Sequence, residues 1–185
     1  MTKTSVSTHH EPTSLAMRTI ETPLGPMRLV ASGEGVVLCE FDDRRALPEE
    51  MREIEDEFGL PPREGRSEFT DQLEGELAAY FRGELKEFRT RLAPFGTPFE
   101  HSVWNQLLKI PYGETRSYGD IARAVGDPGA SRAVGRANGR NRIAILIPCH
   151  RVIAADGSLH GYGGGLDRKR TLLELEGALG GGLFD

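Results

Sequence analysis

The hydrophobic pattern of this chain shifts between the spacing of strands and the spacing of helices, and those shifts constrain the fold more than any other feature. Between Met17 and Phe41 apolar and polar residues alternate, which is typical of strands with one buried face. Turn signals at 23–26 (Pro-Leu-Gly-Pro) and 33–35 (Gly-Glu-Gly) divide this stretch into a strand and a β-hairpin. From Thr97 onward the apolar residues recur at helical spacing. The two patterns together predict an α+β fold in two parts.

The rest of the first part is expected to contain helices and one more strand. Residues 42–66 are rich in charge and contain the pair Pro61-Pro62, which favours a short helix and a loop. Alternation around 88–92 predicts a strand, and apolar residues at helical spacing predict a helix over 68–82. We therefore expect a small α+β domain with an antiparallel sheet over 17–95, preceded by a disordered tail over 1–16.

The second part opens with a clear helix start. Thr97 and Glu100 have the spacing of a capping box, and Pro98 suits the first helical position. The helix that follows is expected to bury Trp104 and its apolar neighbours. We predict a mainly helical domain over 96–185.

Two short helices follow in close succession. Ser117 is a suitable cap for a helix over 118–125, and the Gly-Asp pair after it predicts the end of that helix. A second helix is predicted over 129–138. Two short helices joined by a tight glycine-containing turn are typical of a helix-turn-helix.

Composition excludes several classes of protein. The 185 residues are 38% hydrophobic and 28% charged, which is ordinary for a globular protein in water. No apolar run approaches the roughly 20 residues of a membrane helix, and the polar N-terminus lacks the apolar middle of a signal peptide. We expect a cytoplasmic protein without a membrane partner. With Cys39 and Cys149 as the two cysteines, we expect neither a disulfide nor a metal site.

Positive charge is concentrated in one segment of an acidic chain. The net charge is −5, yet the segment from Arg116 to Arg151 contains seven arginines against two aspartates. Such a segment can meet phosphate at one face. A solvated arginine-rich surface is the alternative.

The helix predicted over 129–138 has an unusual composition. Its sequence, Gly-Ala-Ser-Arg-Ala-Val-Gly-Arg-Ala-Asn, combines small side chains with two arginines. Each interior glycine costs about 1 kcal/mol relative to alanine, so a close approach to another surface must offset that cost. A narrow groove of DNA would suit this helix. Tight packing against another helix of the same chain is the alternative.

A candidate nucleophile follows a short apolar run. Residues 143–147 are expected to form a buried, strand-like segment that ends at Pro148-Cys149-His150. A histidine base beside a cysteine can generate the reactive thiolate. Glu176, near the end of a final helix capped by Asp167, could orient the histidine as a triad carboxylate does. The alternatives are a packed cysteine with a polar neighbour and a solvated glutamate.

The glycine-rich stretch 161–165 (Gly-Tyr-Gly-Gly-Gly) is the remaining conspicuous motif. Such a run is not regular structure, so we predict a flexible loop with exposed backbone amides.

Taken together, these motifs resemble the O6-alkylguanine-DNA alkyltransferases, also called methylated-DNA–protein-cysteine methyltransferases. The string 147–152 (Ile-Pro-Cys-His-Arg-Val) matches the signature of that family, as does 132–135 (Arg-Ala-Val-Gly). Asn141, Tyr118 and Trp104 fall at matching spacings, as does the stretch that begins at Tyr162. The resemblance covers 97–177 strongly and 17–95 loosely.

The resemblance implies a role for each residue of the reaction centre. Cys149 would accept the alkyl group, and His150 would take its proton through a water molecule. Glu176 would hold the histidine, and Asn141 would support the turn that presents the thiol. Arg151 would tie the motif to the fold without a chemical role.

The resemblance also implies how lesion and DNA are bound. Arg132 would enter the base stack and fill the space left by a nucleotide flipped into the pocket. Tyr118 would press on the target phosphate and donate a hydrogen bond to the purine. Tyr162 and the loop backbone would contact the alkylated base. The other residues implied in DNA or base contacts are Ala130, Ser131, Ala133, Gly135, Arg136, Gly163 and Gly164.

The activity implied by the resemblance is DNA repair by a protein that acts once. The alkyl group would pass from O6-alkylguanine, and also from O4-alkylthymine, in double-stranded DNA to Cys149. The thioether product is not hydrolysed, so no cofactor is required. We expect a monomer and leave cooperative binding along DNA open.

Two departures from the family pattern carry expectations of their own. Gly163 stands where a serine is common, which suggests a looser loop around the base. Arg142 stands where a proline is common, and we expect it to add charge near the DNA face.

Three alternatives remain. One is a non-catalytic alkylated-DNA lesion-binding protein, although proteins of that kind lack the acceptor cysteine. The others are a helix-turn-helix transcription factor, which would need a more polar recognition helix, and a cysteine hydrolase, which would turn over repeatedly.

Overall fold

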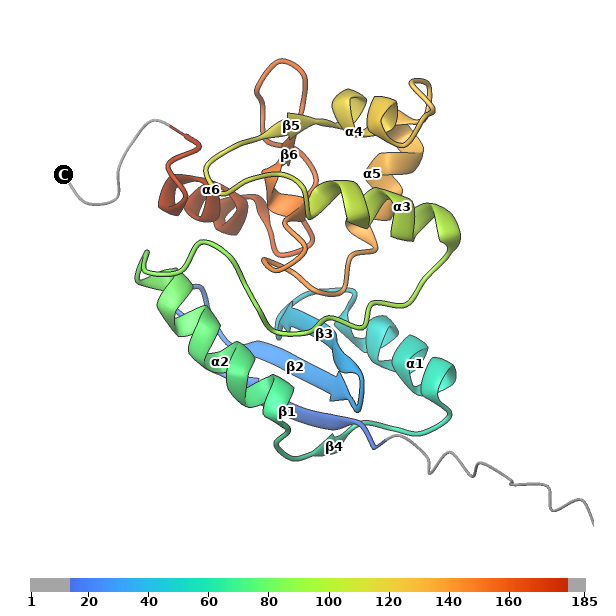
Figure 1. Cartoon of the computed structure of the whole chain (residues 1–185), viewed down its shortest axis with the longest axis vertical. Helices are drawn as coiled ribbons and strands as arrows, with labels where there is room; N and C mark the ends of the chain where they lie inside the picture. Colours follow the sequence, from blue (N-terminus) through green and yellow to red (C-terminus); the bar gives the residue numbers. More distant parts are fainter. Residues whose placement is uncertain (1–13, 180–185) are drawn as a thin grey trace, which may run out of the picture.

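The computed structural model describes residues 14–179. Its first part is a four-stranded sheet in the order β3-β2-β1-β4, drawn in blue and teal at the bottom of Figure 1. The strands are β1 (Ala16–Ile20), β2 (Met27–Ser32), β3 (Gly35–Phe41) and β4 (Arg63–Glu64).

Most of the sheet is built as the alternating pattern predicts. β1, β2 and β3 are antiparallel neighbours, and a two-residue turn at Gly33-Glu34 joins β2 to β3. β4 departs from the antiparallel expectation, because this two-residue strand lies parallel to β1. β1 begins at Ala16, inside the segment predicted as tail, and Leu15 is buried. The rest of that tail prediction, 1–13, lies outside the described residues.

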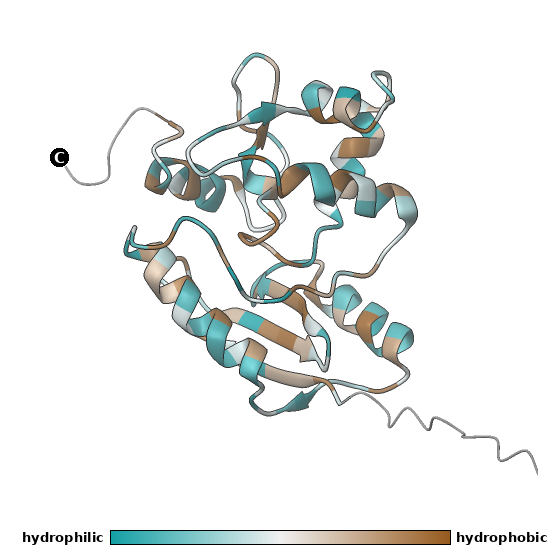
Figure 2. Ribbon diagram, viewed as in Figure 1, coloured by the Kyte–Doolittle hydropathy of each residue, from teal (hydrophilic) through white to brown (hydrophobic). Residues whose placement is uncertain are grey.

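Two helices flank the sheet, and each covers part of its apolar surface. α1 (Leu47–Phe58) packs on a cluster that includes the cross-strand pair Val30 and Leu38. α2 (Glu68–Phe81) contributes to the larger core, which contains the next pair, Leu29 and Cys39. Figure 2 shows hydrophobic residues along the strands between helices whose outer turns are largely hydrophilic. The side-chain alternation of strands therefore places one pair toward each helix.

The second part is mainly helical. Its elements are α3 (Pro98–Leu107), β5 (Arg116–Ser117), α4 (Tyr118–Ala124), α5 (Ser131–Gly139), the 3-10 turn η1 (Cys149–Arg151), β6 (Val152–Ile153) and α6 (Leu166–Leu175). The capping box predicted at Thr97 and the cap predicted at Ser117 are confirmed: each side chain accepts a hydrogen bond from the third residue of its helix. α5 starts two residues later than predicted, after Ala130.

The segment that leads to Cys149 is not the strand that we predicted over 143–147. Only its start pairs, in parallel, with the edge of β3: the backbone N–H of Cys39 donates to Arg142, and that of Ala144 donates to Cys39. The chain then turns, and Ile145 adopts a positive φ of 71°. The apolar residues are buried as expected, but the edge of β3 offers a partner to one end of the segment alone.

Two further local predictions were wrong. Over 88–92, Leu92 forms an isolated bridge with Val36 and no strand develops. Asp167 does not cap the last helix, because α6 begins at Leu166 with Gly165 at the cap position. Asp167 lies in the first turn instead, where its charge still favours the helix dipole.

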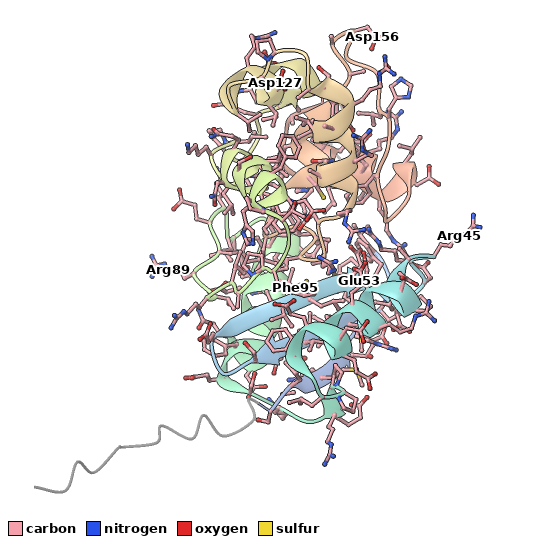
Figure 3. All side chains as sticks on the ribbon, turned by 90° about the vertical axis from the view of Figure 1, so that its right-hand side faces the viewer. Arg45, Glu53, Arg89, Phe95, Asp127 and Asp156 are labelled. Carbon is pink, nitrogen blue, oxygen red and sulfur yellow. The ribbon has the colours of Figure 1, made fainter. Side chains whose placement is uncertain are left out.

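Arg142 lies at the junction of the two parts and not on the DNA face that we expected. Its side chain is 6% exposed, forms an ion pair with Glu53 of α1 and stacks over the ring of Phe95 at 4.4 Å. Figure 3 shows Glu53 and Phe95 close together between the sheet and the helical part. The charge added at this position therefore ties the two parts together.

The α+β fold class is confirmed by this arrangement, whereas the domain boundary between 95 and 96 stays a prediction. The larger core is continuous across that boundary, since it includes Leu29 and Tyr80 as well as Ile143 and Leu172. None of the helices within residues 14–179 has the length and apolarity to cross a membrane.

Candidate active site

Cys149 opens η1 and forms part of the wall of a cavity of about 430 Å³. The residue is 4% exposed. The cavity falls in the range of small-molecule sites. Its other walls come from α4 (Tyr118), from α5 (Gly135) and from the loop that carries Tyr162. Three segments that are far apart in the sequence thus surround the thiol.

His150 lies directly behind the thiol in η1 and is fully buried. Its Nε2 lies 2.7 Å from Oε1 of Glu176. Burial lowers the pKa of His150 despite the carboxylate, so the ring is neutral near pH 7. Nε2 therefore carries the proton donated to Glu176, and the unprotonated Nδ1 has no hydrogen-bond partner within residues 14–179. The residue that follows Cys149 in the chain therefore has a free proton acceptor.

Glu176, at the end of α6, is the centre of a buried polar cluster. Besides His150, it accepts hydrogen bonds from Arg151 Nε (2.8 Å), from Arg151 Nη2 (3.0 Å) and from the hydroxyl of Tyr80 (2.7 Å). Burial acts to raise the pKa of Glu176, but the contacts with His150 and Arg151 outweigh it and hold the pKa at about 2. The carboxylate is therefore ionised at neutral pH, and Arg151 ties η1 to α6.

The thiol itself is protonated in the resting protein. Burial, assisted by Glu40, raises the pKa of Cys149 to about 11, although Asn141 and the charges of Arg44 and Lys169 act in the opposite direction. A thiol with this pKa contains little thiolate at pH 7, so the reaction requires a base. The free nitrogen of His150 is suited to that task.

Asn141 stabilises the irregular turn before the nucleophile. Its side-chain amide donates to the carbonyl of Ile147 at 2.8 Å, and its oxygen accepts from the N–H of Ile143 at 3.0 Å. One side chain therefore bridges both ends of the segment in which Ile145 has a positive φ.

Tyr118 connects α4 to the loop opposite it. Its hydroxyl donates to the carbonyl of His160 at 3.3 Å, and burial followed by the charge of Cys149 raises the Tyr118 pKa. The phenol therefore stays protonated and remains a hydrogen-bond donor. On the same loop, the hydroxyl of Tyr162 is buried and has no partner among the described residues.

α5 presents two arginines to solvent. Arg132 and Arg136 are one turn apart and both exposed, whereas Val134 and Ala137 are buried on the other face. The smaller residues implied in DNA contact, Ala130, Ser131, Ala133 and Gly135, are half-buried.

The arginines of the basic segment are mostly paired. Five of them contact carboxylates: Arg116 with Glu114, Arg123 with Asp120, Arg140 with Glu53 and Glu100, Arg142 with Glu53, and Arg151 with Glu176. Within residues 14–179 Arg132 and Arg136 have no ion pair. The charge available for phosphate is thus concentrated on α5.

The loop 161–165 lies close to other parts of the chain at Gly163 and Gly164, whereas Gly161, Gly163 and Gly165 remain exposed. Its flexibility stays a prediction. A Cβ placed on Gly164 would come within 2.8 Å of Phe41. A Cβ on Gly163 would come within 2.1 Å of Nη1 of Arg44. The absence of side chains lets this loop lie directly against β3 and the residues that follow it.

Three residues of the site were missed by sequence reasoning, namely Arg44, Tyr80 and Lys169. Nζ of Lys169 donates to the carbonyls of Val152 (2.6 Å) and His160 (2.8 Å), and burial lowers its pKa to about 8. A lysine one turn before Leu172 and Leu173 interrupts the apolar face of α6, which is a signal that could have identified it. Arg44 offers no comparable signal, because it lies in a charged stretch.

Both cysteines are free thiols, and Cys39 is fully buried in β3. Across residues 14–179 no group of three or more His, Cys, Asp or Glu side chains is arranged to hold a metal ion.

Glu40 makes a pH-dependent contribution to the stability of the fold, and this contribution can be measured. Burial raises the Glu40 pKa to about 7 in the folded protein, against an ordinary value of 4.5. The folded state therefore binds the proton more tightly, and this contribution to stability is present below about pH 4.5 and is lost as the pH rises through 7. Glu40→Gln stays neutral and does not lose this contribution. The free energy of unfolding of the variant minus that of the wild type should therefore be about 2 to 3 kcal/mol larger at pH 8 than at pH 4.5. Urea titrations at both pH values would measure this, and parallel profiles for the two proteins would contradict it.

Comparison with known proteins now identifies the chain. Residues 98–178 match the family described as 6-O-methylguanine DNA methyltransferase, DNA binding domain. A methylated-DNA–protein-cysteine methyltransferase of Methanosarcina acetivorans is 49% identical over 161 residues, which cover 85% of this chain and 96% of that protein. The protein of the same name from Mycobacterium tuberculosis is 52% identical over 159 residues, covering 86% and 90% respectively.

Solved structures agree with these relatives. The crystal structure of Mycobacterium tuberculosis OGT in complex with DNA has a TM-score of 0.76 at 47% identity, covering 88% of this chain and 93% of that one. The O6-methylguanine-DNA methyltransferase of Pyrococcus kodakaraensis has a TM-score of 0.58 at 30% identity, covering 88% and 99%. The chain therefore belongs to the O6-methylguanine-DNA methyltransferase family.

Proposed function

We propose that this protein repairs DNA by transferring an alkyl group from O6 of guanine to Sγ of Cys149, once per molecule. The observation that carries the proposal is the position of Cys149 in the wall of a cavity of about 430 Å³, with the His150–Glu176 pair behind it. The names of the relatives describe the same activity for those proteins.

The first step is removal of the thiol proton. Nδ1 of His150 accepts the proton of Cys149 through a bridging water molecule, and Glu176 stabilises the resulting imidazolium through its 2.7 Å contact. The ionised carboxylate favours the charged ring, which offsets part of the cost of ionising a buried thiol.

The second step is displacement at the alkyl carbon. The thiolate attacks that carbon, a C–S bond forms, and the C–O bond to guanine breaks with its electron pair passing to the base. The hydroxyl of Tyr118 donates a hydrogen bond to the purine and neutralises the developing charge. The product is a thioether that the site does not hydrolyse, so each molecule acts once and requires no cofactor.

The damaged base must leave the helix to reach the thiol. Arg132 fills the vacated space in the base stack, and Arg136 and the small residues of α5 lie along the groove. The Tyr162 hydroxyl and the backbone of Gly163 and Gly164 contact the base. O4-alkylthymine enters the same pocket. We further propose that the protein is cytoplasmic and acts as a monomer on double-stranded DNA.

Mass spectrometry tests the proposal directly. The protein is incubated with a duplex oligonucleotide that contains O6-methylguanine, and the expected result is a gain of one methyl group on the peptide that contains Cys149. The undamaged duplex is the control. DNA binding without a mass change would instead favour the lesion-binding alternative. Binding to one fixed sequence would favour a transcription factor, and repeated turnover of an acyl substrate would favour a hydrolase.

Arg132→Ala is expected to slow transfer from duplex DNA and to leave transfer from the free base O6-benzylguanine unchanged. Extruding a base costs a few kcal/mol, and the Arg132 side chain is proposed to offset part of this cost. Its removal should therefore slow the duplex reaction by about 10- to 100-fold. Single-turnover rates on both substrates measure the difference. Equal slowing on the two substrates would contradict the role in base extrusion.

A further inference from the structure

Arg44 reaches the cavity from the first part of the chain, and its guanidinium is fixed on three sides. Nη1 donates to Glu40 at 2.7 Å, and Nη2 donates to the carbonyl of Gly139 at 2.8 Å and pairs with Glu50 at 2.9 Å. The side chain is 8% exposed. Three such contacts leave the guanidinium little freedom to move, and one of them is with the last residue of α5.

The loop that carries Tyr162 rests on this guanidinium. A Cβ on Gly163 would lie 2.1 Å from Nη1 of Arg44 and 2.5 Å from its Cζ, which is far inside any real contact. The end of an arginine is normally flexible enough to give way, but this one is held by the contacts described above. A side chain at position 163 would therefore have to lift the loop.

The same region contains two buried donors without a partner among the described residues. These are Nε of Arg44 and the hydroxyl of Tyr162, and both residues line the cavity beside Cys149. Buried polar atoms in a folded protein are normally satisfied, so these two donors mark a part of the cavity wall whose hydrogen bonds the described residues leave incomplete.

We propose that Arg44 is a positioning residue for alkyl transfer, which rests on the function proposed above. Its guanidinium sets the position of loop 161–165 through Gly163 and keeps a fixed positive charge beside Cys149. This explains why a family position that often carries serine carries glycine here, because the arginine occupies the space that serine would need.

The charge of Arg44 acts within a defined group of neighbours. It lowers the Cys149 pKa, as Lys169 does, whereas Glu40 raises it. The ionisable side chains around the Cys149 thiol are two cations, one carboxylate, one imidazole and two phenols. They are Arg44, Lys169, Glu40, His150, Tyr118 and Tyr162.

A double-mutant cycle tests the contact between loop and guanidinium. Gly163→Ser alone should slow single-turnover methyl transfer by about 10- to 100-fold, because a shift near 1 Å in a reacting geometry has effects of that size. In an Arg44→Met background the same change should slow transfer by less than about threefold, since the space is then free. Arg89 is an exposed arginine that Figure 3 shows at the left, on the opposite side of the view from Arg45. Arg89→Met is the matched control background and should leave the effect of Gly163→Ser unchanged. Equal effects in the Arg44→Met and wild-type backgrounds would overturn the proposal.

A second readout needs neither DNA nor transfer. The rate at which iodoacetamide modifies Cys149, followed by peptide mass spectrometry across pH, reports the ionisation of the thiol. Arg44→Met should move the midpoint of this profile to higher pH, and Arg44→Lys should restore it while leaving the loop contact unrepaired. An unchanged midpoint in Arg44→Met would overturn the proposal that the charge of Arg44 acts on the Cys149 thiol.

Removing Arg44 leaves Glu40 and Glu50 unpaired, so thermal melting accompanies each variant. If Arg44→Met does not fold, the cycle is run in Glu40→Gln/Glu50→Gln/Arg44→Met, in which both buried charges are also removed. The pH profile of iodoacetamide modification does not depend on repair activity. A wild type that transfers no methyl group would contradict the proposed function. Normal transfer by the wild type, with no coupling between positions 44 and 163, would contradict only the role of Arg44.

Discussion

Cys149→Ala is expected to abolish alkyl transfer while leaving DNA binding intact. In the part of the chain that the structure describes, Cys149 is the one cysteine that borders the cavity, because Cys39 is fully buried in β3. Removing a catalytic nucleophile typically costs on the order of 10⁴-fold or more. The substitution removes one sulfur atom from the wall of an existing cavity, so the fold and the surface of α5 should be unaffected.

The measurement pairs transfer with binding. Single-turnover transfer from an O6-methylguanine duplex should fall to background in Cys149→Ala, and the affinity for the same duplex should remain within about threefold of the wild type, since the arginines proposed to contact DNA are unchanged. Cys39→Ala is the matched control and should retain transfer. Undiminished demethylation by Cys149→Ala would remove the basis of the repair assignment.

Glu176→Gln is expected to reduce both activity and stability. Glutamine keeps the size of the side chain but removes the charge that balances Arg151 and holds the proton on Nε2 of His150. Breaking a buried ion pair by removing one partner costs about 3 to 5 kcal/mol. Loss of an oriented general base slows reactions by about 10²- to 10⁴-fold, and transfer should fall within that range.

The stability effect of Glu176→Gln should also depend on pH. The Glu176 pKa is about 2 in the folded protein, below the ordinary 4.5, so the carboxylate stabilises the fold above pH 4.5 and this contribution is lost as the pH falls toward 2. Urea unfolding should therefore show a large difference from the wild type at pH 7 and a smaller one at pH 3. Tyr80→Phe removes a single donor to the same carboxylate and, as the control, should cost about 1 kcal/mol. A difference between Glu176→Gln and wild type that is constant with pH would contradict the assignment of charge.

Features that depend on neighbours in the chain were predictable from the sequence. The caps at Thr97 and Ser117, the turn at Gly33-Glu34 and the helix over 68–82 all appear close to their predicted positions. Each is determined by contacts within a few residues, which a sequence displays directly. The signature around Cys149 likewise predicted a nucleophile at a position where the structure has a cavity, because the chemistry of a thiol beside a histidine is local.

Features that depend on a distant partner were not predictable. The segment 143–147 was expected to be a strand, but a strand requires an edge along its whole length, and β3 pairs with its start alone. Arg142 was expected near DNA, and its partner Glu53 lies 89 residues away in the sequence. Nothing in the sequence indicated that Gly163 lies against Arg44, which is more than a hundred residues earlier in the chain.

The sequence by itself thus determined the α+β class and the starts of the capped helices, and it predicted which sulfur reacts, since hydrophobic period, caps and residue chemistry are local properties. The tertiary structure alone decided which arginines remain free, what surrounds Glu176 and what the loop 161–165 contacts. Those outcomes depend on charges and volumes that folding brings together from opposite ends of the chain, and a single sequence contains no record of their distances.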